Sequence, residues 1–229
     1  MFTGLVQSLG SLRLLTEDRL EILCESADSS AILTDLEIGD SVAVDGACLT
    51  VEQILPQGFI AAISPETLDR TTIGHRDRTA NYVNLETSLR VGGKIGGHFV
   101  SGHIDGVGKL VSATATASSW EMKFAAPQSL TAEWSNYLSR YLVSKGSIAV
   151  NGVSLTIADC DPHGDWFTVA VIPLTYTETN LSQLKPDAWV NLEADILGKY
   201  VEKLISTPHH PRSSQRETIT PEFLAANGY

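Results

Sequence analysis

The sequence predicts an all-β protein in which one small antiparallel barrel or sandwich occurs twice, and three observations support this. The eleven residues SVAVDGACLTV from Ser41 to Val51 return from Ser147 to Ile157 as SIAVNGVSLTI, with six identical positions. Val83-Asn84-Leu85-Glu86 likewise returns as Val190-Asn191-Leu192-Glu193 at nearly the same spacing. Both copies are rich in short β-branched segments that end at turn residues. We therefore interpret the chain as a tandem duplication of one domain.

Each copy contains short segments with the composition of β-strands. The expected strands cover residues 41–44, 49–51 and 59–63 in the first copy and 148–150, 155–157, 167–172 and 190–195 in the second. Asp45-Gly46 and Asn151-Gly152 predict type I′ hairpin turns, because both central residues of that turn need positive φ. Alternation along the following strand places Cys48 and Thr50 on one face, and Ser154 repeats the arrangement in the second copy.

An amphipathic helix is expected after Asp195, because apolar residues recur at spacings of three and four from Ile196 to Ile205. This segment has no counterpart between the copies. A short final helix is expected from Thr220 to Leu224, with a proline at its first helical position. Residues 207–214 are polar and are expected to be loose.

The glycine pairs Gly92-Gly93 and Gly96-Gly97 indicate a linker between the copies. We therefore expect three parts, namely an N-terminal domain over residues 1–97, a C-terminal domain over residues 98–195, and a helix with a tail over residues 196–229.

Composition restricts the possible functions. With 229 residues, of which 43% are hydrophobic, the chain can build two full cores. Its net charge of -11 opposes binding to nucleic acid, which needs clustered Lys and Arg. No apolar run approaches the roughly 18–20 residues that span a bilayer, and the first residues lack the basic start of a signal peptide, so we expect a cytoplasmic protein. The odd number of cysteines, Cys24, Cys48 and Cys160, indicates reduced thiols rather than disulfides or a zinc site.

The glycine-rich segment from Gly92 to His103 does not have the spacing of a phosphate-binding loop. Its glycines are better explained by a tight crossing between the copies and by close approach of the backbone to a flat ligand. His98 and His103 could suggest a metal pair, but their odd separation would place them on opposite faces of a regular strand. We expect no metal site.

The two copies differ at positions where chemistry could occur. FTGLV near the N-terminus aligns with VSGHI in the second copy, so His103 stands where the first copy has Leu5, and Cys48 aligns with Ser154. Two related but unequal pockets suit a protein that handles two related ligands differently. Each position also has a structural explanation, since free cysteine is often simply buried and a lone histidine is often structural. Asp195 could cap the following helix, take part in catalysis, or do both.

Several motifs, in this order, resemble riboflavin synthase of the alpha-chain type. They are the start MFTGLVQ, the two (Asp/Asn)-Gly-x-x-Leu-Thr hairpins, the SGHIDG segment and the run VNLEADILGKYVEKL, so the match extends from Met1 to about Leu204. The resemblance implies two homologous six-stranded Greek-key β-barrels in tandem plus a C-terminal α-helix through which three chains associate. Each barrel would bind one 6,7-dimethyl-8-ribityllumazine. A four-carbon unit would pass from one lumazine to the other, giving riboflavin and 5-amino-6-ribitylaminouracil, without a metal or an organic cofactor.

The resemblance also implies the site residues. The catalytic candidates are Ser41, Cys48, His103 and Asp195. The substrate-binding candidates are Gly4, Leu5, Val6, Cys48, Leu49, Thr50, Ala62, Ile63, Ser64, Pro65, Glu66, Thr67, Gly102, His103, Ile104, Lys145, Ser154, Leu155, Thr156, Ile172, Pro173, Leu174, Thr175, Tyr176 and Thr177. We expect His103 or a neighbouring base to remove a proton from the 7-methyl group of one lumazine. Ser41 or Cys48 would handle the nucleophilic or proton-transfer step on the other ring.

Two other functions are open at this point. In luminous bacteria the same fold serves as a lumazine- or flavin-binding antenna protein, so a non-catalytic carrier is the main alternative. A structural barrel without a ligand would leave the unequal polar positions unexplained. The match of Ser41, Cys48, His103 and Asp195 to the enzyme pattern favours the enzyme. Association with a separate lumazine-making partner is also open.

Overall fold

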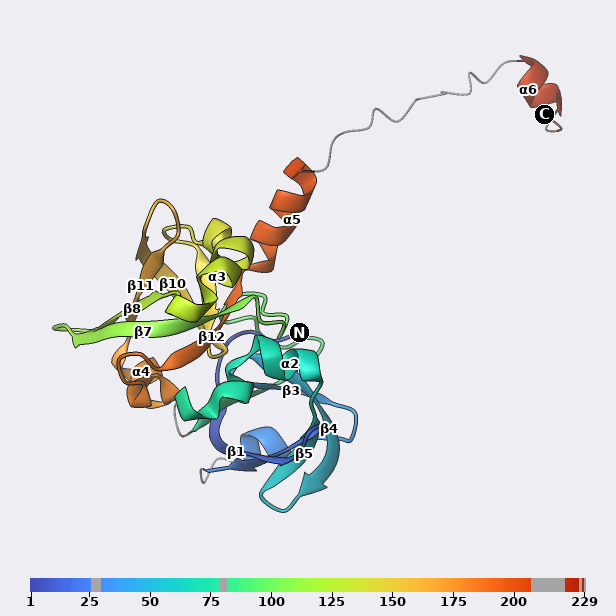
Figure 1. Cartoon of the computed structure of the whole chain (residues 1–229). Coiled ribbons are helices and arrows are strands. Elements are labelled where there is room, and N and C mark those ends of the chain that lie inside the picture. The colour runs from blue at the N-terminus through green and yellow to red at the C-terminus, as the bar shows by residue number, and fades with distance from the viewer. Residues whose placement is uncertain (26–29, 79–81, 207–220, 227, 229) are drawn as a thin grey trace. The chain divides into compact units, whose positions relative to one another are not determined.

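The computed structural model of the chain describes residues 1–25, 30–78, 82–206, 221–226 and 228 (Figure 1). Residues 1–199 form one compact unit and residues 200–229 form a second. The first unit contains two closed antiparallel barrels of six strands each. The predicted fold class, two tandem barrels followed by a C-terminal helix, is therefore confirmed.

The two barrels have the same topology. The N-terminal barrel consists of β1 (Ser8–Thr16), β2 (Arg19–Cys24), β3 (Ser41–Val44), β4 (Ala47–Leu55), β5 (Gly58–Ala62) and β6 (Val83–Thr87). The C-terminal barrel consists of β7 (Gly106–Ala115), β8 (Trp120–Ala125), β9 (Ser147–Val150), β10 (Val153–Cys160), β11 (Trp166–Val171) and β12 (Trp189–Ala194). The strand order is β1-β2-β5-β4-β3-β6 in the first barrel and β7-β8-β11-β10-β9-β12 in the second. Since β5 lies beside β2 and β6 returns to lie between β3 and β1, the connections are of the Greek-key kind.

Short helices connect the strands. The α-helices are α1 (Ser30–Leu33), α2 (Pro65–Arg70), α3 (Thr131–Tyr137), α4 (Pro173–Thr177), α5 (Ile196–Ser206) and α6 (Pro221–Ala226), and the 3₁₀ helices are η1 (Thr72–Arg78), η2 (Gln128–Leu130), η3 (Ser139–Tyr141) and η4 (Asn180–Gln183). Helices α2 and α4 occupy equivalent places, directly after β5 and β11.

The two C-terminal helices are confirmed as α5 and α6, although Thr220, the expected cap of α6, and the expected loose segment at residues 207–214 lie outside the described residues. Among the residues that are described, no helix is both long and apolar enough to cross a membrane.

The predicted type I′ turns are confirmed. Asp45 and Gly46 have φ values of 48° and 81°, and Asn151 and Gly152 have values of 45° and 76°. In the strand that follows the first turn, Leu49 is buried whereas Thr50 is exposed, as the predicted alternation requires. The turns therefore fix the register of β4 and β10 and with it the face on which the polar side chains lie.

Reciprocal hydrogen bonds join the two barrels. The Asn84 side-chain amide donates to the Asn151 carbonyl over 2.9 Å, and the Asn191 side-chain amide donates to the Asp45 carbonyl over 2.9 Å. All four residues are almost fully buried. Buried amides need such partners, because an unpaired polar group in the interior costs about 1–3 kcal/mol. This contact explains why the asparagine of the Val-Asn-Leu-Glu motif occurs in both copies.

His98 and His103 do not lie on a regular strand, contrary to the expectation from the sequence. Residues 98–105 precede β7 and form no regular strand. Their backbone makes one isolated antiparallel bridge, in which Phe2 N donates to Val100 O over 2.7 Å and Val100 N donates to Phe2 O over 3.1 Å. The expectation that strand alternation separates His98 from His103 was therefore wrong, because it assumed a regular strand. The tertiary bridge sets their environment instead, and His98 is buried whereas His103 is exposed.

Candidate functional site

Two segments cross from one barrel to the other. Gly4 O accepts a hydrogen bond from Ser154 N over 2.8 Å, so residues 4–6 lie on the C-terminal barrel although they lead into the N-terminal one. Gly102 O accepts from Cys48 N over 2.9 Å, so residues 102–104 lie on the N-terminal barrel although they lead into the C-terminal one. We call residues 4–6 the first crossing segment and residues 102–104 the second.

Both crossing segments need their glycine. Gly4 and Gly102 have φ values of +74° and +86°, which L side chains rarely adopt. A Cβ at Gly4 would lie 2.6 Å from Ser154 Cβ, and a Cβ at Gly102 would lie 2.6 Å from Cys48 Cβ. The glycines therefore allow each segment to lie directly against the opposite barrel.

The second crossing segment completes a pocket of 230 Å³ on the N-terminal barrel, which we call the Cys48 pocket. The start of β4, helix α2 and the crossing segment form its walls. Its lining residues are Ala47, Cys48, Ser64, Glu66, Thr67, Arg70, Thr71, Gly102, His103 and Ile104. Seven of the predicted site residues, those at positions 48, 64, 66, 67 and 102–104, thus come together here.

The first crossing segment completes a pocket of 400 Å³ on the C-terminal barrel, the Ser154 pocket. The start of β10, helix α4 and the crossing segment form its walls, so the two pockets are built from equivalent elements. Its lining residues are Gly4, Leu5, Val6, Gln7, Ser8, Leu9, Val153, Ser154, Leu174, Thr175, Thr177, Glu178 and Thr179. The predicted residues at positions 4–6, 154, 174, 175 and 177 come together here.

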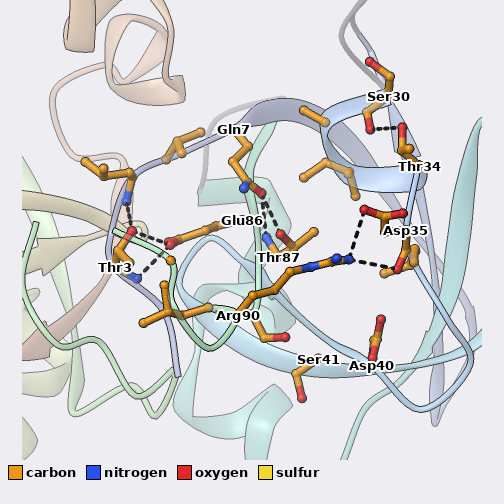
Figure 2. A pocket seen from close by; sticks show the side chains of 18 of the residues that line it. Thr3, Gln7, Ser30, Thr34, Asp35, Asp40, Ser41, Glu86, Thr87 and Arg90 are labelled. Carbon is orange, nitrogen blue, oxygen red and sulfur yellow. Dashed lines mark hydrogen bonds and ion pairs between the residues drawn. The ribbon is translucent and has the colours of Figure 1, made fainter. Parts of the chain in front are cut away.

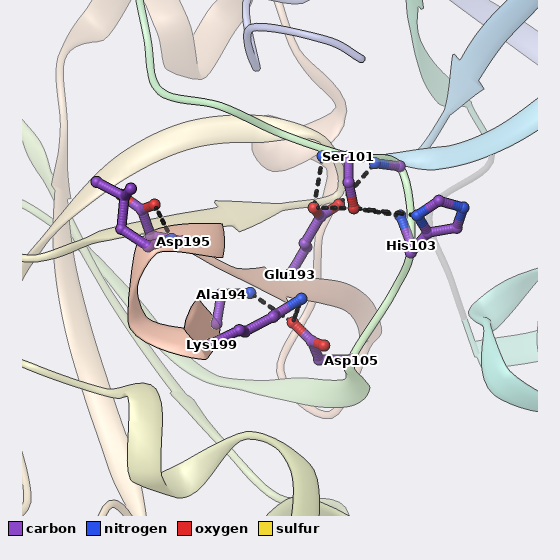
Figure 3. A network of polar contacts seen from close by, with 9 residues as sticks. Ser101, His103, Asp105, Glu193, Ala194, Asp195 and Lys199 are labelled. Carbon is purple, nitrogen blue, oxygen red and sulfur yellow. Dashed lines mark hydrogen bonds and ion pairs between the residues drawn. The ribbon is translucent and has the colours of Figure 1, made fainter. Parts of the chain in front are cut away.

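The Cys48 pocket combines a thiol with an imidazole. Cys48 is half-buried and His103 is exposed. Figure 3 shows Ser101 between Glu193 and His103, and its Oγ lies 3.2 Å from His103 Nδ1. Ser101 Oγ also accepts from His103 N over 3.2 Å, which holds both the backbone and the ring of His103. The pocket therefore presents a nucleophilic sulfur and a group that can accept or donate a proton.

A second imidazole, that of the buried His98, contacts the Ser154 hydroxyl from outside the lining of the Ser154 pocket. His98 Nδ1 lies 2.7 Å from Ser154 Oγ, and Nε2 has no hydrogen-bond partner among the described residues. Burial lowers the pKa of His98 below its ordinary value, while the nearby charge of Asp195 acts in the opposite direction. A neutral imidazole at this position can exchange a proton with Ser154. Sequence reasoning missed this contact, because His98 and Ser154 lie 56 residues apart in the chain.

Asp195 caps helix α5. Its Oδ1 accepts from Leu197 N over 3.0 Å, which is the N-cap arrangement that its position before the helix indicated. Its catalytic part stays a prediction.

Ser41 lies apart from both pockets. It is paired with Thr50 across β3 and β4, and it lines a third cavity of 590 Å³ in the N-terminal barrel (Figure 2). In this cavity the Arg90 guanidinium reaches the Asp35 carboxylate over 3.2 Å. Lys145 lines neither the Cys48 pocket nor the Ser154 pocket and is exposed, with its ammonium donating to the Ala158 carbonyl over 3.4 Å.

The other predicted contact residues lie outside the linings of the Cys48 and Ser154 pockets. Leu49, Leu155 and Ile63 belong to the barrel cores, so their side chains point inward. Thr50 and Thr156 are exposed on the outer faces. The remaining residues of this group are Ala62, Pro65, Ile172, Pro173, Tyr176 and Asp195. Within the described ranges, no group of three His, Cys, Asp or Glu residues could hold a metal ion.

Comparison with known proteins gives one consistent answer. A family model described as the lumazine binding domain matches residues 3–88 and again residues 101–195. Riboflavin synthase from Actinobacillus pleuropneumoniae is 36% identical over 230 residues, covering 100% of both chains. Riboflavin synthase from Bacillus subtilis (strain 168) is 35% identical over 233 residues, again covering 100% of both. Riboflavin synthase from Mycobacterium tuberculosis (strain ATCC 25618 / H37Rv) is 38% identical over 211 residues, covering 90% of this chain and 98% of the relative.

Solved structures agree with this result. The crystal structure of LumP complexed with 6,7-dimethyl-8-(1'-D-ribityl) lumazine is 25% identical with a TM-score of 0.68, and it covers 85% of this chain and 99% of LumP. LumP complexed with riboflavin gives a TM-score of 0.69 at the same identity and coverage. With two domain matches, full-length relatives and a duplicated pair of barrels, this chain belongs to the riboflavin synthase family and is built from two lumazine-binding domains.

Proposed function

We propose that this chain catalyses the dismutation of two molecules of 6,7-dimethyl-8-ribityllumazine to riboflavin and 5-amino-6-ribitylaminouracil. It does so by moving a four-carbon unit from one lumazine to the other. One observation carries the proposal, namely two pockets built from equivalent elements but with unequal polar groups. The Cys48 pocket offers Cys48 and His103, whereas the Ser154 pocket offers Ser154, whose hydroxyl contacts the buried His98 behind the pocket lining. A reaction between two identical substrates needs one site for a donor and a different one for an acceptor.

The alternative is a carrier that binds a lumazine or a flavin without converting it. This chain is 36% identical to the riboflavin synthase from Actinobacillus pleuropneumoniae and 25% identical to LumP. Binding alone also gives no reason for a thiol in one pocket and a histidine–serine contact in the other. Both differences favour the synthase.

We assign roles from position. His103 removes a proton from the 7-methyl group of one lumazine, and Cys48 or Ser41 acts on the other ring. Cys48 and His103 line the same pocket and would therefore reach the same ring, so Ser41, which lines the separate 590 Å³ cavity, is the better candidate for the step on the other ring. General acid–base catalysis of this kind contributes about 10²–10⁴ in rate.

We further propose that the functional division runs at residues 1–97, 98–195 and 196–229, and that α5 joins three chains into a homotrimer in the cytoplasm. Leu197, Val201 and Leu204 are exposed on α5 at spacings of four and three. Such a stripe is typical of a helix that packs against another helix.

In the trimer the N-terminal barrel of one chain would face the C-terminal barrel of another. Holding two lumazines in one such site supplies the entropic advantage of an intramolecular reaction. The three free thiols, Cys24, Cys48 and Cys160, fit a reducing compartment.

The test is a turnover assay with 6,7-dimethyl-8-ribityllumazine as the only substrate. We expect one riboflavin for every two lumazines consumed, followed by absorbance and chromatography. Binding without consumption would identify the carrier instead.

His103→Ala is expected to reduce turnover by about 10²-fold or more while the protein stays folded. His163→Ala is the matched control, because His163 is exposed in the turn between β10 and β11 and lines neither pocket. Equal turnover in the two variants would remove His103 from the mechanism.

A further inference from the structure

Two buried glutamates hold the start of the two crossing segments in the same way. Glu86 ends the Val-Asn-Leu-Glu motif on β6 and is 6% exposed. Its Oε1 accepts from Thr3 N and from Thr3 Oγ1, each over 2.7 Å (Figure 2). Its Oε2 accepts from Gly4 N over 3.0 Å. One carboxylate thus satisfies three donors of a segment that has no strand partner for them.

Glu193 repeats this arrangement on β12, where it is 1% exposed. Its Oε1 accepts from Ser101 N over 2.6 Å and from Ser101 Oγ over 2.7 Å, and its Oε2 accepts from Gly102 N over 3.0 Å (Figure 3). The motif that repeats in the sequence therefore places the same three-donor clamp in both barrels.

Each clamp suits an ionised carboxylate, because burial, the larger effect, raises the pKa of the glutamate but the three hydrogen bonds lower it. A carboxylate has two accepting oxygens and no donor, which matches a site with three donors and no free acceptor. Glutamine has the same shape but carries an amide NH₂ in place of one oxygen, so one of the segment's donors would face another donor. A buried charge that is hydrogen-bonded on both oxygens is retained, whereas an unpaired one is costly.

The clamps act across the molecule. Glu86 belongs to the N-terminal barrel, but the segment it holds continues as the first crossing segment and completes the Ser154 pocket of the C-terminal barrel. Glu193 belongs to the C-terminal barrel, but its segment continues as the second crossing segment and completes the Cys48 pocket of the N-terminal barrel. We propose that Glu86 and Glu193 are crossed positioning residues, each of which sets the geometry of the pocket on the opposite barrel.

The second clamp also reaches His103. Ser101 Oγ donates to Glu193 and lies 3.2 Å from His103 Nδ1, so the carboxylate orients the hydroxyl that holds the ring. In the first copy the corresponding residue is Leu5, whose backbone N donates to Thr3 Oγ1 over 3.3 Å and whose side chain has no nitrogen. The two clamps thus share their geometry, but the first crossing segment places a leucine side chain at the pocket and the second places an imidazole.

The main test measures hydrogen–deuterium exchange of single backbone amides in the full chain without substrate. The Ser154 amide donates to Gly4 O and reports the first crossing segment, and the Cys48 amide donates to Gly102 O and reports the second. In Glu86→Gln we expect exchange at Ser154 to accelerate about tenfold with Cys48 unchanged, because hydrogen bonds to charged groups are the stronger class. In Glu193→Gln we expect the reverse, so each variant is the matched control of the other.

The outcomes separate positioning from general stability. Acceleration of both amides in both variants, or of the amide on the glutamate's own barrel, would overturn the proposal, as would no acceleration. If a glutamine variant does not fold, Thr3→Ala and Ser101→Ala replace it, since each removes one of the three donors and leaves the carboxylate in place. They are expected to show the same crossed pattern at a smaller amplitude.

A kinetic test rests on the proposed function. In Glu193→Gln the pH profile of turnover should move, because the amide no longer supplies the negative charge that orients the Ser101 hydroxyl beside His103. In Glu86→Gln the profile should keep its position while turnover falls. Since the exchange experiment uses no substrate, a chain that fails to make riboflavin would leave the crossed pattern intact and would overturn only the function.

Discussion

Replacing Gly102 by alanine tests how closely the second crossing segment lies against the N-terminal barrel. The φ of +86° costs an L residue roughly 1–2 kcal/mol. The added Cβ would also lie 2.6 Å from Cys48 Cβ and 2.8 Å from the Phe2 ring, a distance at which something must shift. Such overpacking costs about 1–3 kcal/mol. We therefore expect Gly102→Ala to lower the free energy of unfolding by about 2–5 kcal/mol.

Two other glycines separate these effects. Gly92 has a similar φ of +85° but nothing within 4 Å of an added Cβ, so Gly92→Ala should lose only the conformational part, about 1–2 kcal/mol. Gly106, at the start of β7, has neither positive φ nor a neighbour within 4 Å. Gly106→Ala should therefore be neutral or stabilising by up to about 1 kcal/mol.

The assay is urea unfolding of the three variants, with the slope m compared to confirm that only stability has changed. Turnover is measured in parallel, and it should fall in Gly102→Ala and persist in Gly92→Ala, because only the former displaces the segment from Cys48. A Gly102→Ala variant no less stable than Gly92→Ala would show that the segment does not approach Cys48 as described.

Three further predictions concern assembly and pH. Replacing Leu197 and Val201 on α5 by aspartate should convert trimers to monomers, and light scattering that still reports the parent mass would contradict the proposed helix contact. Trimers refolded from a mixture of Cys48→Ala and Asp195→Ala chains should regain activity if the site lies between chains. A site within one chain would always contain one of the two substitutions, so the mixture would stay inactive. Burial lowers the pKa of His98, so the unfolded chain binds its proton more readily and stability should fall as pH drops below 6.5. His98→Gln should remove the part of this decline that His98 causes. Comparing stability against pH for the parent and for His98→Gln isolates the effect of His98 from that of Glu86 and Glu193, whose raised pKa values act in the opposite direction.

Local chemistry was enough to predict the strands that lie next to the turns. Asp45-Gly46 and Asn151-Gly152 impose positive φ, and the β-branched segments beside them have few alternatives to an extended backbone. The predicted segments 59–63 and 167–172 differ from β5 and β11 by one residue at each end. Strands such as β1 and β8 were not predicted, because their pairing depends on partners elsewhere in the barrel rather than on their own composition.

The candidate site could be predicted in part. Aligning the copies singled out Cys48 and His103, and the structure places both in one pocket. The same alignment gave no role to Glu86, since a glutamate present in both copies shows no difference between them. Nor could it identify His98, whose contact with Ser154 joins two residues of the same copy that lie far apart in the chain.

The sequence by itself determined the hairpin turns and the face on which Cys48 and Ser154 lie, because these depend on short-range pattern. It also determined the duplication and the positions at which the two copies differ, because these follow from comparison of one half with the other. Only the tertiary structure decided that each barrel's pocket is completed by a segment that leads into the other barrel. That exchange rests on contacts between distant residues, from Gly4 to Ser154 and from Gly102 to Cys48, and on glutamates whose partners lie far away in the chain. No local periodicity records such contacts, since they form only when both barrels have closed and the crossing segments have satisfied their backbone donors.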